Sequence, residues 1–531
     1  MPTGKILKEL SRYKTGTFAY IIHRHSILRP DKEAYVYGTQ RLTYAEFNAK
    51  VNSLAHALQE LGVNKGDSIG ILSWNCLDYA IVYGAAMKGG YILSRFNPRL
   101  GAEELDYLIN YSEANTLFVG PELVAVTESV RSRLHGVKNF VSLEEKAPNM
   151  MFIQDFLSSY PTEEPDVQVE EDDGFFIIYT SGTTGVPRGA VYSHREAWDD
   201  CRTYIINLSI QSDDRHIQVS PMFHIAGDTI FRSILYIGGC NIITKFFDAG
   251  ATLRLIQDEK ATHISIVPTH LVAMLAVPDV KKYDVSSLKF IWYGGSPMPL
   301  EVLKKGLSTF GNVFGQGYGQ SESGPAISHL PKEDHDVLGK PEEKRLSSVG
   351  QPDIGVQVRI VDDKGNDVNP GEMGEIIVRS KHIMQKYWNK PEETNNTIVD
   401  GWLHTGDIGC YDENGYVYIV DRKKDMIITG GENVFPREIE EILYRHPSVQ
   451  EAAVIGIPDP YWVEKVHAVV GLKKGAGCTA EELIALCKKN LAGYKAPKSV
   501  EFMDSLPKNA AGKIMKRELR EKYWADSGRK I

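Results

Sequence analysis

The sequence predicts an α/β protein: a large N-terminal domain of α/β sheets with a small β-barrel-like region, then a small α+β C-terminal domain. Helix and strand patterns alternate over residues 40–140 and again after residue 174. Repeated βα units require parallel sheets that carry helices on both faces. From about Gly350 short strands with glycine turns replace this alternation, and after Asp421 the pattern becomes mixed α+β. No Pro/Gly-rich linker marks that last change, so we expect a short hinge there rather than a tether.

The first series of elements opens with a well-marked helix. Thr43 and Glu46 form a capping box, an apolar stripe runs from Phe47 to Leu61, and Gly62 ends the helix. In this series we also expect strands near residues 68–73, 91–93 and 116–119, and helices near 77–87 and 102–111. The second series predicts strands near 217–220, 241–245, 263–268, 290–293 and 313–318, and helices near 230–235, 253–259, 271–275 and 300–307. Beyond residue 350 we expect strands near 356–361, 374–378, 452–457, 467–472 and 500–502, and helices near 437–445 and 481–490.

Composition excludes several classes of protein. The chain has 531 residues and a net charge of −9, which argues against a nucleic-acid binder. Its six cysteines form no CxxC pair and no disulfide-like framework, which fits a reducing compartment. No stretch approaches the ~18 apolar residues of a membrane-spanning helix, and the N-terminus lacks the apolar run of a signal peptide. We therefore expect a soluble, cytoplasmic protein.

The segment Tyr179 to Arg188 is the strongest candidate for a binding loop. It follows the apolar run 174–179, which reads as a buried strand, and a second extended run resumes at Gly189. Between them stand four hydroxyl residues and two glycines, from Thr180 to Gly185. A strand-loop-strand that presents backbone N–H groups and hydroxyls suits a polyphosphate, because an anion needs many short, fixed donors. Ser193 then caps the next helix.

Further polar and glycine-rich motifs follow predicted strands, where sites form in α/β sheets. His224 stands in the segment 221–227, directly after one strand. The segments 292–297 and 317–322 follow two others and pair aromatic residues with glycines that let a ligand approach the backbone. In the second of these, Tyr318 can stack on a purine, and Glu322 supplies a hard oxygen for Mg²⁺. Asp407 follows a glycine turn in the segment 401–407, and a carboxylate is the usual acceptor for ribose hydroxyls.

Together with the segments 421–440 and 506–514, these motifs resemble those of the adenylate-forming superfamily, in that family's order, from about residue 30 to 523. The superfamily comprises acyl-CoA synthetases, luciferases and peptide-synthetase adenylation domains. The resemblance implies ATP and Mg²⁺ as cofactors and coenzyme A as a second substrate. The catalytic residues that it implies are Lys513, Glu322 and Arg188, with Glu322 and Thr184 at the metal.

The resemblance also implies residues for each ligand. ATP or AMP would contact Thr180, Ser181, Gly182, Thr183, Thr184, Gly294, Gly295, Ser296, Gly317, Tyr318, Gly319, Gln320, Ser321, Asp407 and Arg422. The acid would lie against His224, Trp292 and Tyr293, and the CoA channel would be bordered by Gly430, Gly431 and Glu432. Lys424 would be the pivot between domains 1–421 and 426–531, within a hinge at 422–425. The C-terminal domain, which carries Lys513, would be mobile.

Three positions depart from the family pattern. Arg188 stands where lysine is usual, and Lys386 and Val463 stand where glycine is common. An arginine keeps the charge but is a planar fork rather than a point donor, so its contact with phosphate need not be the same. None of the three changes removes a catalytic group.

The expected activity is that of an AMP-forming acyl-CoA synthetase. A carboxylic acid would attack the α-phosphorus of ATP, pyrophosphate would leave, and the acyl-AMP would then react with the CoA thiol. The resemblance points away from an amino-acid substrate, because amino-acid enzymes usually place an aspartate beside the phenylalanine that precedes His224. Medium-chain, alicyclic and aromatic acids all fit, and a homodimer is compatible with the sequence. The alternatives are a luciferase-like oxygenase, a stand-alone adenylation domain that loads a carrier protein, and a catalytically silent acyl-binding protein.

Overall fold

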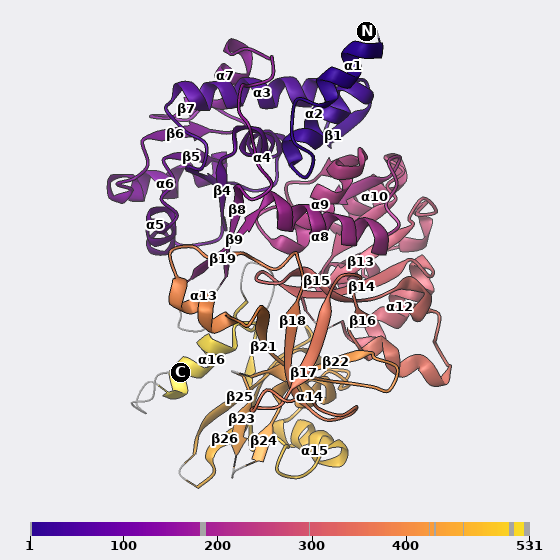
Figure 1. Ribbon diagram of the computed structural model, residues 1–531. Helices are drawn as coiled ribbons and strands as arrows, with labels where there is room; N and C mark the ends of the chain where they lie inside the picture. The colour runs from indigo at the N-terminus through magenta and orange to yellow at the C-terminus, as the bar shows by residue number, and fades with distance from the viewer. Residues whose placement is uncertain are drawn as a thin grey trace. The chain divides into compact units, whose positions relative to one another are not determined.

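The computed structural model describes residues 3–180, 187–296, 298–423, 425–429, 432–459, 461–508 and 514–524 (Figure 1). The chain divides into two compact units. The first unit comprises Met1–Met298, Val302–Val358 and Val378–Leu403. The second comprises Pro299–Glu301, Arg359–Ile377 and His404–Ile531. The predicted domain boundary near Asp421 stays a prediction.

The first unit contains an eight-stranded sheet of order β19-β9-β8-β4-β3-β5-β6-β7. Its strands are β3 (Ser68–Leu72), β4 (Ile92–Phe96), β5 (Thr116–Val119), β6 (Asn139–Ser142), β7 (Met151–Phe152), β8 (Gly174–Thr180), β9 (Arg188–Ser193) and β19 (Lys386–Tyr387). Strands β3 to β8 are parallel. Strand β9 pairs antiparallel with β8 on one side and with β19 on the other. The expected βα series is confirmed in α3 (Tyr44–Glu60), α4 (Leu77–Gly89) and α5 (Ala102–Tyr111), and the capping box of α3 is present.

A nine-stranded sheet of order β16-β15-β14-β13-β12-β10-β11-β1-β2 completes the first unit. Its strands are β1 (Glu33–Tyr37), β2 (Gln40–Thr43), β10 (Arg215–Gln218), β11 (Cys240–Ile243), β12 (His263–Ile266), β13 (Phe290–Gly294), β14 (Phe314–Gln320), β15 (Gly324–Leu330) and β16 (Gln351–Pro352). Strands β10 to β14 are parallel, as expected of the second series. The pattern did not predict β1, which pairs with β11 through Tyr35 and Asn241. Its partner is some 200 residues away in the chain, so no local signal could reveal it.

Helices α8 (His194–Asn207) and α9 (Ile225–Ile237) pack on each other and against the nine-stranded sheet. Ser193 caps α8 as predicted, with its side chain accepting from a backbone N–H and with Glu196 completing a capping box. Helix α4 contacts both β4 and β1, so it lies against strands of both sheets. The remaining helices of the chain outside the second unit's α/β core are α1 (Thr3–Leu10), α2 (Phe18–Leu28), α6 (Val124–Val130), α7 (Ile153–Ser159), α10 (Ala249–Asp258), α11 (Pro268–Leu275), α12 (Leu300–Phe310) and α13 (Pro391–Thr397).

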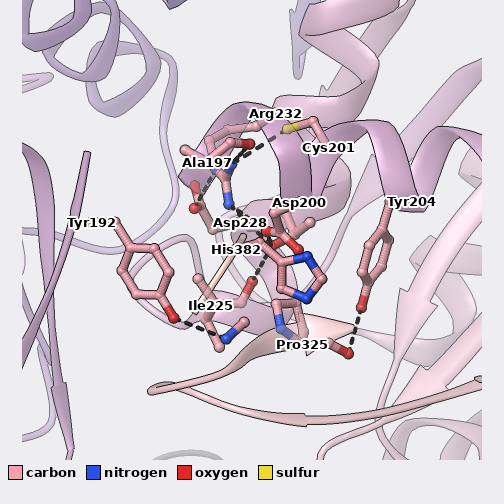
Figure 2. A network of polar contacts seen from close by, with 12 residues as sticks. Tyr192, Ala197, Asp200, Cys201, Tyr204, Ile225, Asp228, Arg232, Pro325 and His382 are labelled. Atoms are coloured by element: carbon pink, nitrogen blue, oxygen red, sulfur yellow. Dashed lines mark hydrogen bonds and ion pairs between the residues drawn. The ribbon is translucent and has the colours of Figure 1, made fainter. Parts of the chain in front are cut away.

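Four fully buried charges join these layers. Arg95 of β4 reaches Asp228 of α9, with 2.8 Å between Nη1 and Oδ1. Arg232, one turn further along α9, donates to Asp228 (2.7 Å) and to Asp200 of α8 (3.1 Å), as Figure 2 shows. None of the four side chains is more than 1% exposed. Two positive and two negative groups therefore neutralise each other inside the core, and they connect the eight-stranded sheet to the helices on the nine-stranded one.

A third sheet has the order β17-β18-β21-β20, with β22 paired to β21. Its strands are β17 (Gln357–Val361), β18 (Gly374–Arg379), β20 (Ile398–Val399), β21 (Trp402–Tyr411) and β22 (Val417–Arg422). The boundary between the two units falls within β17, β18 and β21. Strand β21 is antiparallel to β20 and β22, so the hairpin-like region expected after Gly350 is present.

The α/β core of the second unit has a sheet of order β24-β23-β26-β25, with β27 paired to β26. Its elements are β23 (Ile427–Thr429), β24 (Glu432–Val434), α14 (Pro436–Leu443), β25 (Val449–Asp459), β26 (Val463–Leu472), α15 (Ala480–Asn490), β27 (Ser499–Met503) and α16 (Lys516–Trp524). The apolar faces of α14 and α15 pack against this sheet, as in the contact of Ile439 and Leu483 with the buried strand residues. The expected α+β pattern is therefore confirmed. Among the described residues, no helix is both long and apolar enough to cross a membrane.

The buried charge network predicts a strong dependence on Asp228. We expect Asp228→Asn to lower the free energy of unfolding by about 3–5 kcal/mol, because it leaves Arg95 and Arg232 with less compensating charge in the core. Urea titration followed by tryptophan fluorescence measures the change. Lys282→Ala is the control, because the Lys282–Asp279 pair is 76% and 65% exposed. Its loss should cost about 0.5 kcal/mol or less. Equal effects of the two substitutions would contradict the role of the network.

Candidate functional site

The predicted binding loop joins β8 to β9, and only its two ends are described. Thr180 ends β8 and lies directly opposite Arg188, the first residue of β9. Ser181, Gly182, Thr183 and Thr184 lie outside the described residues. The antiparallel pairing places the side chains of Thr180 and Arg188 on the same face of the sheet. A polar face therefore flanks the loop where the phosphates are expected.

Glu322, on the turn between β14 and β15, lies against the last residue of β8. Its Oε1 accepts a hydrogen bond from the Thr180 hydroxyl (3.2 Å) and another from the Tyr387 hydroxyl (2.9 Å). Its backbone carbonyl accepts from the Met384 N–H (2.8 Å). The structure thus brings together two residues that the sequence predicted, Thr180 and Glu322. It adds Tyr387, which the sequence did not identify.

The turn that carries Glu322 is anchored to the core. The Tyr192 hydroxyl donates to the carbonyl of Ser321 (2.7 Å) and accepts from the N–H of Gly324 (2.9 Å). Tyr204 donates to the carbonyl of Pro325, as Figure 2 shows, and His382 donates to the carbonyl of the next residue, Ala326. Three consecutive residues at the start of β15 are therefore held by side chains. The position of the Glu322 carboxylate depends on this anchoring.

Arg188 lies on an aromatic ring beside a carboxylate. Its guanidinium carbon is 4.4 Å from the centre of the Tyr387 ring, and its Nη1 is 3.5 Å from an oxygen of Glu393. Its side chain is 14% exposed. The cation that replaces the family's lysine is thus partly enclosed, and its direction is set by a stacking contact.

The glycines of the two strand-end motifs have a packing role that the structure makes explicit. Gly294 and Gly317 are partners in the β13–β14 ladder. A Cβ atom on Gly294 would lie 2.6 Å from the Gly317 carbonyl oxygen, and one on Gly317 would lie 2.1 Å from the Trp292 ring. Gly295 has φ +76° with room for a Cβ atom, and Gly319 packs against the backbone at Gly324. Close strand packing alone thus explains why Gly294, Gly317 and Gly319 are glycines. A role in ATP binding stays a prediction for all four glycines, for Ser296 and for Gln320.

The aromatic side chains of the same motifs are buried. Tyr318 is 8% exposed, and its stacking on adenine stays a prediction. Tyr293 is fully buried, and its hydroxyl donates to His335 (2.9 Å), whose other ring nitrogen donates to a backbone carbonyl. Burial lowers the pKa of His335 to about 4, so its ring is neutral at pH 7 and can accept that bond. Trp292 packs edge-on against Tyr204. The predicted acyl-pocket role of Trp292 and Tyr293 remains untested.

His224 lies in the segment that follows β10, which ends at Gln218, and forms the N-cap of α9. Its Nε2 atom is buried and receives no hydrogen bond from the described residues. Burial, followed by the charges of Arg95 and Arg99, lowers the pKa of His224 to about 4. The imidazole is therefore neutral at pH 7 and offers a polar atom but no charge.

Further aromatic residues follow the neighbouring strands, and the sequence analysis did not select them. His270 in α11 follows β12, and its ring stacks on Phe247, after β11, with 3.9 Å between ring centres. Its Nδ1 is buried without a hydrogen bond from the described residues, and burial lowers its pKa to about 4. Trp74, after β3, meets Phe246 edge-on at 5.2 Å. The rule that polar and aromatic residues at strand ends mark a site could have found them.

Asp407 and Arg422 form an ion pair in the second unit. They are partners in the β21–β22 ladder, and Nε of Arg422 is 3.0 Å from Oδ1 of Asp407. Asp407 is 3% exposed, and its N–H donates to the Thr405 hydroxyl. Pairing thus brings together two predicted nucleotide contacts that are fifteen positions apart in the chain. Their contact with ribose or phosphate stays a prediction.

Several predicted residues of the C-terminal part lie outside the described residues: Lys424, Gly430, Gly431 and Lys513. Glu432 begins β24, but its side chain is not described. Within the predicted hinge, Asp425 is held by Arg520 of α16, with 3.0 Å between Oδ1 and Nη1. Helix α16 follows directly on the segment that carries Lys513. The last residue of the predicted hinge and the helix after Lys513 are therefore linked by an ion pair.

Comparison with known proteins shows the class of adenylate-forming enzymes. The family model named AMP-binding enzyme matches residues 23–388, and the model named AMP-binding enzyme C-terminal domain matches residues 438–513. The chain therefore belongs to the family of AMP-binding enzymes. The predicted resemblance to the adenylate-forming superfamily is confirmed.

Individual relatives agree with this assignment. The chain is 37% identical over 501 residues to a protein named feruloyl-CoA synthase from Amycolatopsis sp, covering 94% of this chain and 98% of that protein. It is 35% identical to a fatty acid–[acyl-carrier-protein] ligase from Streptomyces coeruleorubidus, covering 96% of each chain. Among solved structures, an anthranilate CoA ligase in complex with anthranoyl-AMP has a TM-score of 0.87 at 27% identity, covering 97% of this chain and 98% of that one. ATP-bound MatB from Rhodopseudomonas palustris has a TM-score of 0.86 at 28% identity, covering 96% and 100%.

These relatives confirm two predictions. The fold is a mixed α/β architecture with a large N-terminal and a smaller C-terminal domain, as in the matching structures. The activity is that of an AMP-forming acyl-CoA synthetase, an acid–thiol ligase that uses ATP. The individual site residues remain predictions, because no comparison assigns them.

Val463, which stands where glycine is common in the family, has a strained backbone whose effect on stability can be measured. It lies opposite Thr429 in β26, is 61% exposed and has φ +70°. A β-branched residue is strained there, whereas glycine is not. We expect Val463→Gly to raise the free energy of unfolding by about 1 kcal/mol, since the relieved strain exceeds the added entropy of the unfolded chain.

The matched control is Lys465→Gly, two residues along the same strand, where no positive φ occurs. Glycine should cost about 0.5–1 kcal/mol there. Urea unfolding monitored by circular dichroism compares the two variants. A loss of stability in both would show that Val463 is not strained.

Proposed function

We propose that this chain activates an apolar carboxylic acid, lacking an α-amine, with Mg²⁺ and ATP and then transfers the acyl group to coenzyme A. The observation that supports the proposal most directly is the arrangement at the ends of β8 and β9. Thr180 and Tyr387 orient the Glu322 carboxylate, and the Arg188 cation lies on the same Tyr387 ring. The Glu322 carboxylate, proposed to bind a cation, and the Arg188 guanidinium, proposed to bind phosphate, are thus held in fixed positions at the ends of these strands.

The chemistry explains why such groups are needed. One oxygen of the substrate carboxylate attacks the α-phosphorus of ATP, and the bond from that phosphorus to pyrophosphate breaks. The acid and the nucleotide are both anions, so compensating charge must stand between them. We propose that Arg188 and Lys513 supply it. In the second step the CoA sulfur attacks the acyl carbonyl and AMP leaves, so neither step needs a protein nucleophile.

The residues present fit a magnesium ion. Mg²⁺ is usually bound through one or two carboxylates together with substrate phosphates, rather than by a cage of protein groups. The described residues contain no cluster of three or more histidine, cysteine or acidic side chains suited to a metal. Glu322 is a single carboxylate beside the loop and matches that mode of binding. We propose that Glu322 and Thr184 hold the ion, which supplies positive charge against the phosphates when bound.

The strand-end residues support an aromatic acid. His224 is neutral, so it provides no counter-charge for an ammonium group, whose burial without one would cost several kcal/mol. The loops after β3 and β11 contribute Trp74, Phe246 and Phe247, and α11 contributes His270; these rings suit a flat apolar substrate. A relative named feruloyl-CoA synthase and a structure with anthranoyl-AMP are in keeping with this choice.

The acceptor needs its own test, because one relative is named a ligase for acyl-carrier protein. We propose CoA, with Gly430, Gly431 and Glu432 along its channel and Lys424 as the pivot that exchanges Lys513 for this loop. We also propose that the enzyme works in the cytoplasm, since all six cysteines are free thiols.

A panel of acids tests the proposed substrate and acceptor together. We expect pyrophosphate release with aromatic propenoic and benzoic acids to exceed that with medium-chain fatty acids and with the matching α-amino acids. Acyl-CoA should form only when CoA is present, as detected by mass spectrometry. A preference for an amino acid over its des-amino analogue would overturn the substrate class. Acylation of a carrier protein but not of CoA would contradict the proposal that CoA is the acceptor. Oxygen consumption without CoA would contradict it as well.

Lys513 provides a second test, because its charge is needed only while two anions react. We expect Lys513→Ala to reduce acyl-AMP formation at least about 100-fold, in line with the loss of one key electrostatic group. Conversion of supplied acyl-AMP to acyl-CoA should stay within a few-fold of the unchanged enzyme. Lys508→Ala is the control in the same segment, since Lys508 pairs with Glu451 rather than serving the substrate. Equal losses in both half-reactions would mean that Lys513 does not act in the first one.

A further inference from the structure

Strand pairing places Tyr387 next to the binding loop. Tyr387 lies opposite Ala190, so its side chain points to the same face as those of Ala190 and Arg188, two residues apart on β9. Thr180 lies opposite Arg188 on that face. Backbone bonds from Gln385 and Trp388 to β9 hold the short strand β19 in this register. Three strands thus present Thr180, Arg188 and Tyr387 side by side.

The Tyr387 hydroxyl fixes one oxygen of Glu322. Both Thr180 and Tyr387 donate to Oε1, whereas no described residue forms a hydrogen bond or an ion pair with Oε2. Tyr387 is only 2% exposed, and its N–H donates to the Thr394 hydroxyl. The donor is therefore rigid, and it turns the second carboxylate oxygen away from itself. A carboxylate held through one oxygen presents the other in a defined direction.

The Tyr387 ring fixes the direction of Arg188. The guanidinium lies 4.4 Å from the ring centre, and Glu393 holds Nη1 from a second side. A planar guanidinium stacks on a ring face, and a lysine ammonium does not. One side chain therefore contacts both charged groups that flank the loop, the carboxylate through its hydroxyl and the cation through its ring.

We infer that Tyr387 is a positioning residue that holds Glu322 for the metal ion and Arg188 for the phosphates of ATP in one fixed arrangement. This inference rests on the proposed function for the roles of Glu322 and Arg188. It also accounts for the arginine at position 188: the chain supplies a ring and a carboxylate that suit a planar cation. The two contacts of Tyr387 can be removed separately, because one uses the hydroxyl and the other uses the ring.

Tyr387→Phe tests the hydroxyl. The measurement is binding of Mn²⁺ to the enzyme–ATP complex by electron paramagnetic resonance, and binding of ATP without metal by calorimetry. We expect the Mn²⁺ affinity to fall about tenfold, the effect of one hydrogen bond to a charged group. Metal-free ATP affinity should stay within about twofold, because the phenyl ring still supports Arg188. Tyr111→Phe is the matched control, since its hydroxyl binds the Trp388 carbonyl and touches neither charge.

Tyr387→Leu and Arg188→Lys test the ring. Tyr387→Leu should also weaken metal-free ATP binding, by about fivefold for the loss of a partly desolvated cation–π contact. Arg188→Lys should weaken it similarly in the unchanged enzyme but have no further effect in Tyr387→Leu. The cycle of the two substitutions isolates the contact between the two side chains. Circular dichroism of each variant verifies folding, and the phenylalanine variant keeps the volume of the core.

Three results would overturn the inference. The first is an unchanged Mn²⁺ affinity in Tyr387→Phe, and the second is an equal fall in metal-free and metal-dependent binding in that variant. The third is an additive effect of Tyr387→Leu and Arg188→Lys. If no acid supports pyrophosphate release while these binding results hold, the proposed function is wrong and the positioning role of Tyr387 stands.

Discussion

The ion pair between Arg95 and Asp228 is the contact on which the first unit depends. Arg95 belongs to β4 of the eight-stranded sheet, and Asp228 belongs to α9, which covers the nine-stranded sheet. Because neither side chain reaches water, each charge needs the other in place, and Arg232 and Asp200 complete the balance. Two sheets built from separate stretches of sequence are thereby linked by buried charges as well as by apolar packing.

The candidate site inherits this rigidity. Its carboxylate stands on a turn whose backbone is bound by Tyr192 from the eight-stranded sheet, although the turn itself belongs to the nine-stranded sheet. Its cation stands on the first residue of β9, against a ring from β19. Catalysis between two anions requires charges that are already in place, because moving them during the reaction would cost reorganisation energy. The same strands that build the core supply that fixed arrangement.

The sequence predicted what local patterns encode. The βα series, the capping box at Thr43 and the N-cap Ser193 all follow from neighbouring residues. It missed what depends on distant pairing. Strand β1 is placed by β11, and the two-residue strand β19 is placed by β9, so Tyr387 had no local sign of its role. The sequence could have identified His270, since it follows a predicted strand as His224 does. An isolated histidine after a strand, however, is a weak signal.

With His224 in the acyl pocket, as proposed above, its position limits how the substrate range of this enzyme can change. It is the residue directly before α9, and one turn later that helix is tied to β4 by Asp228. A larger acid cannot be accommodated by moving the helix, since that would separate buried charges. On the proposed placement of the acid, divergence toward new acids would proceed through side chains on the loops after β3 and β11, such as Trp74 and Phe246, which take no part in the buried ion pairs. Selection for a new substrate, in nature or in the laboratory, would leave α9 unaltered and concentrate its changes in those loops.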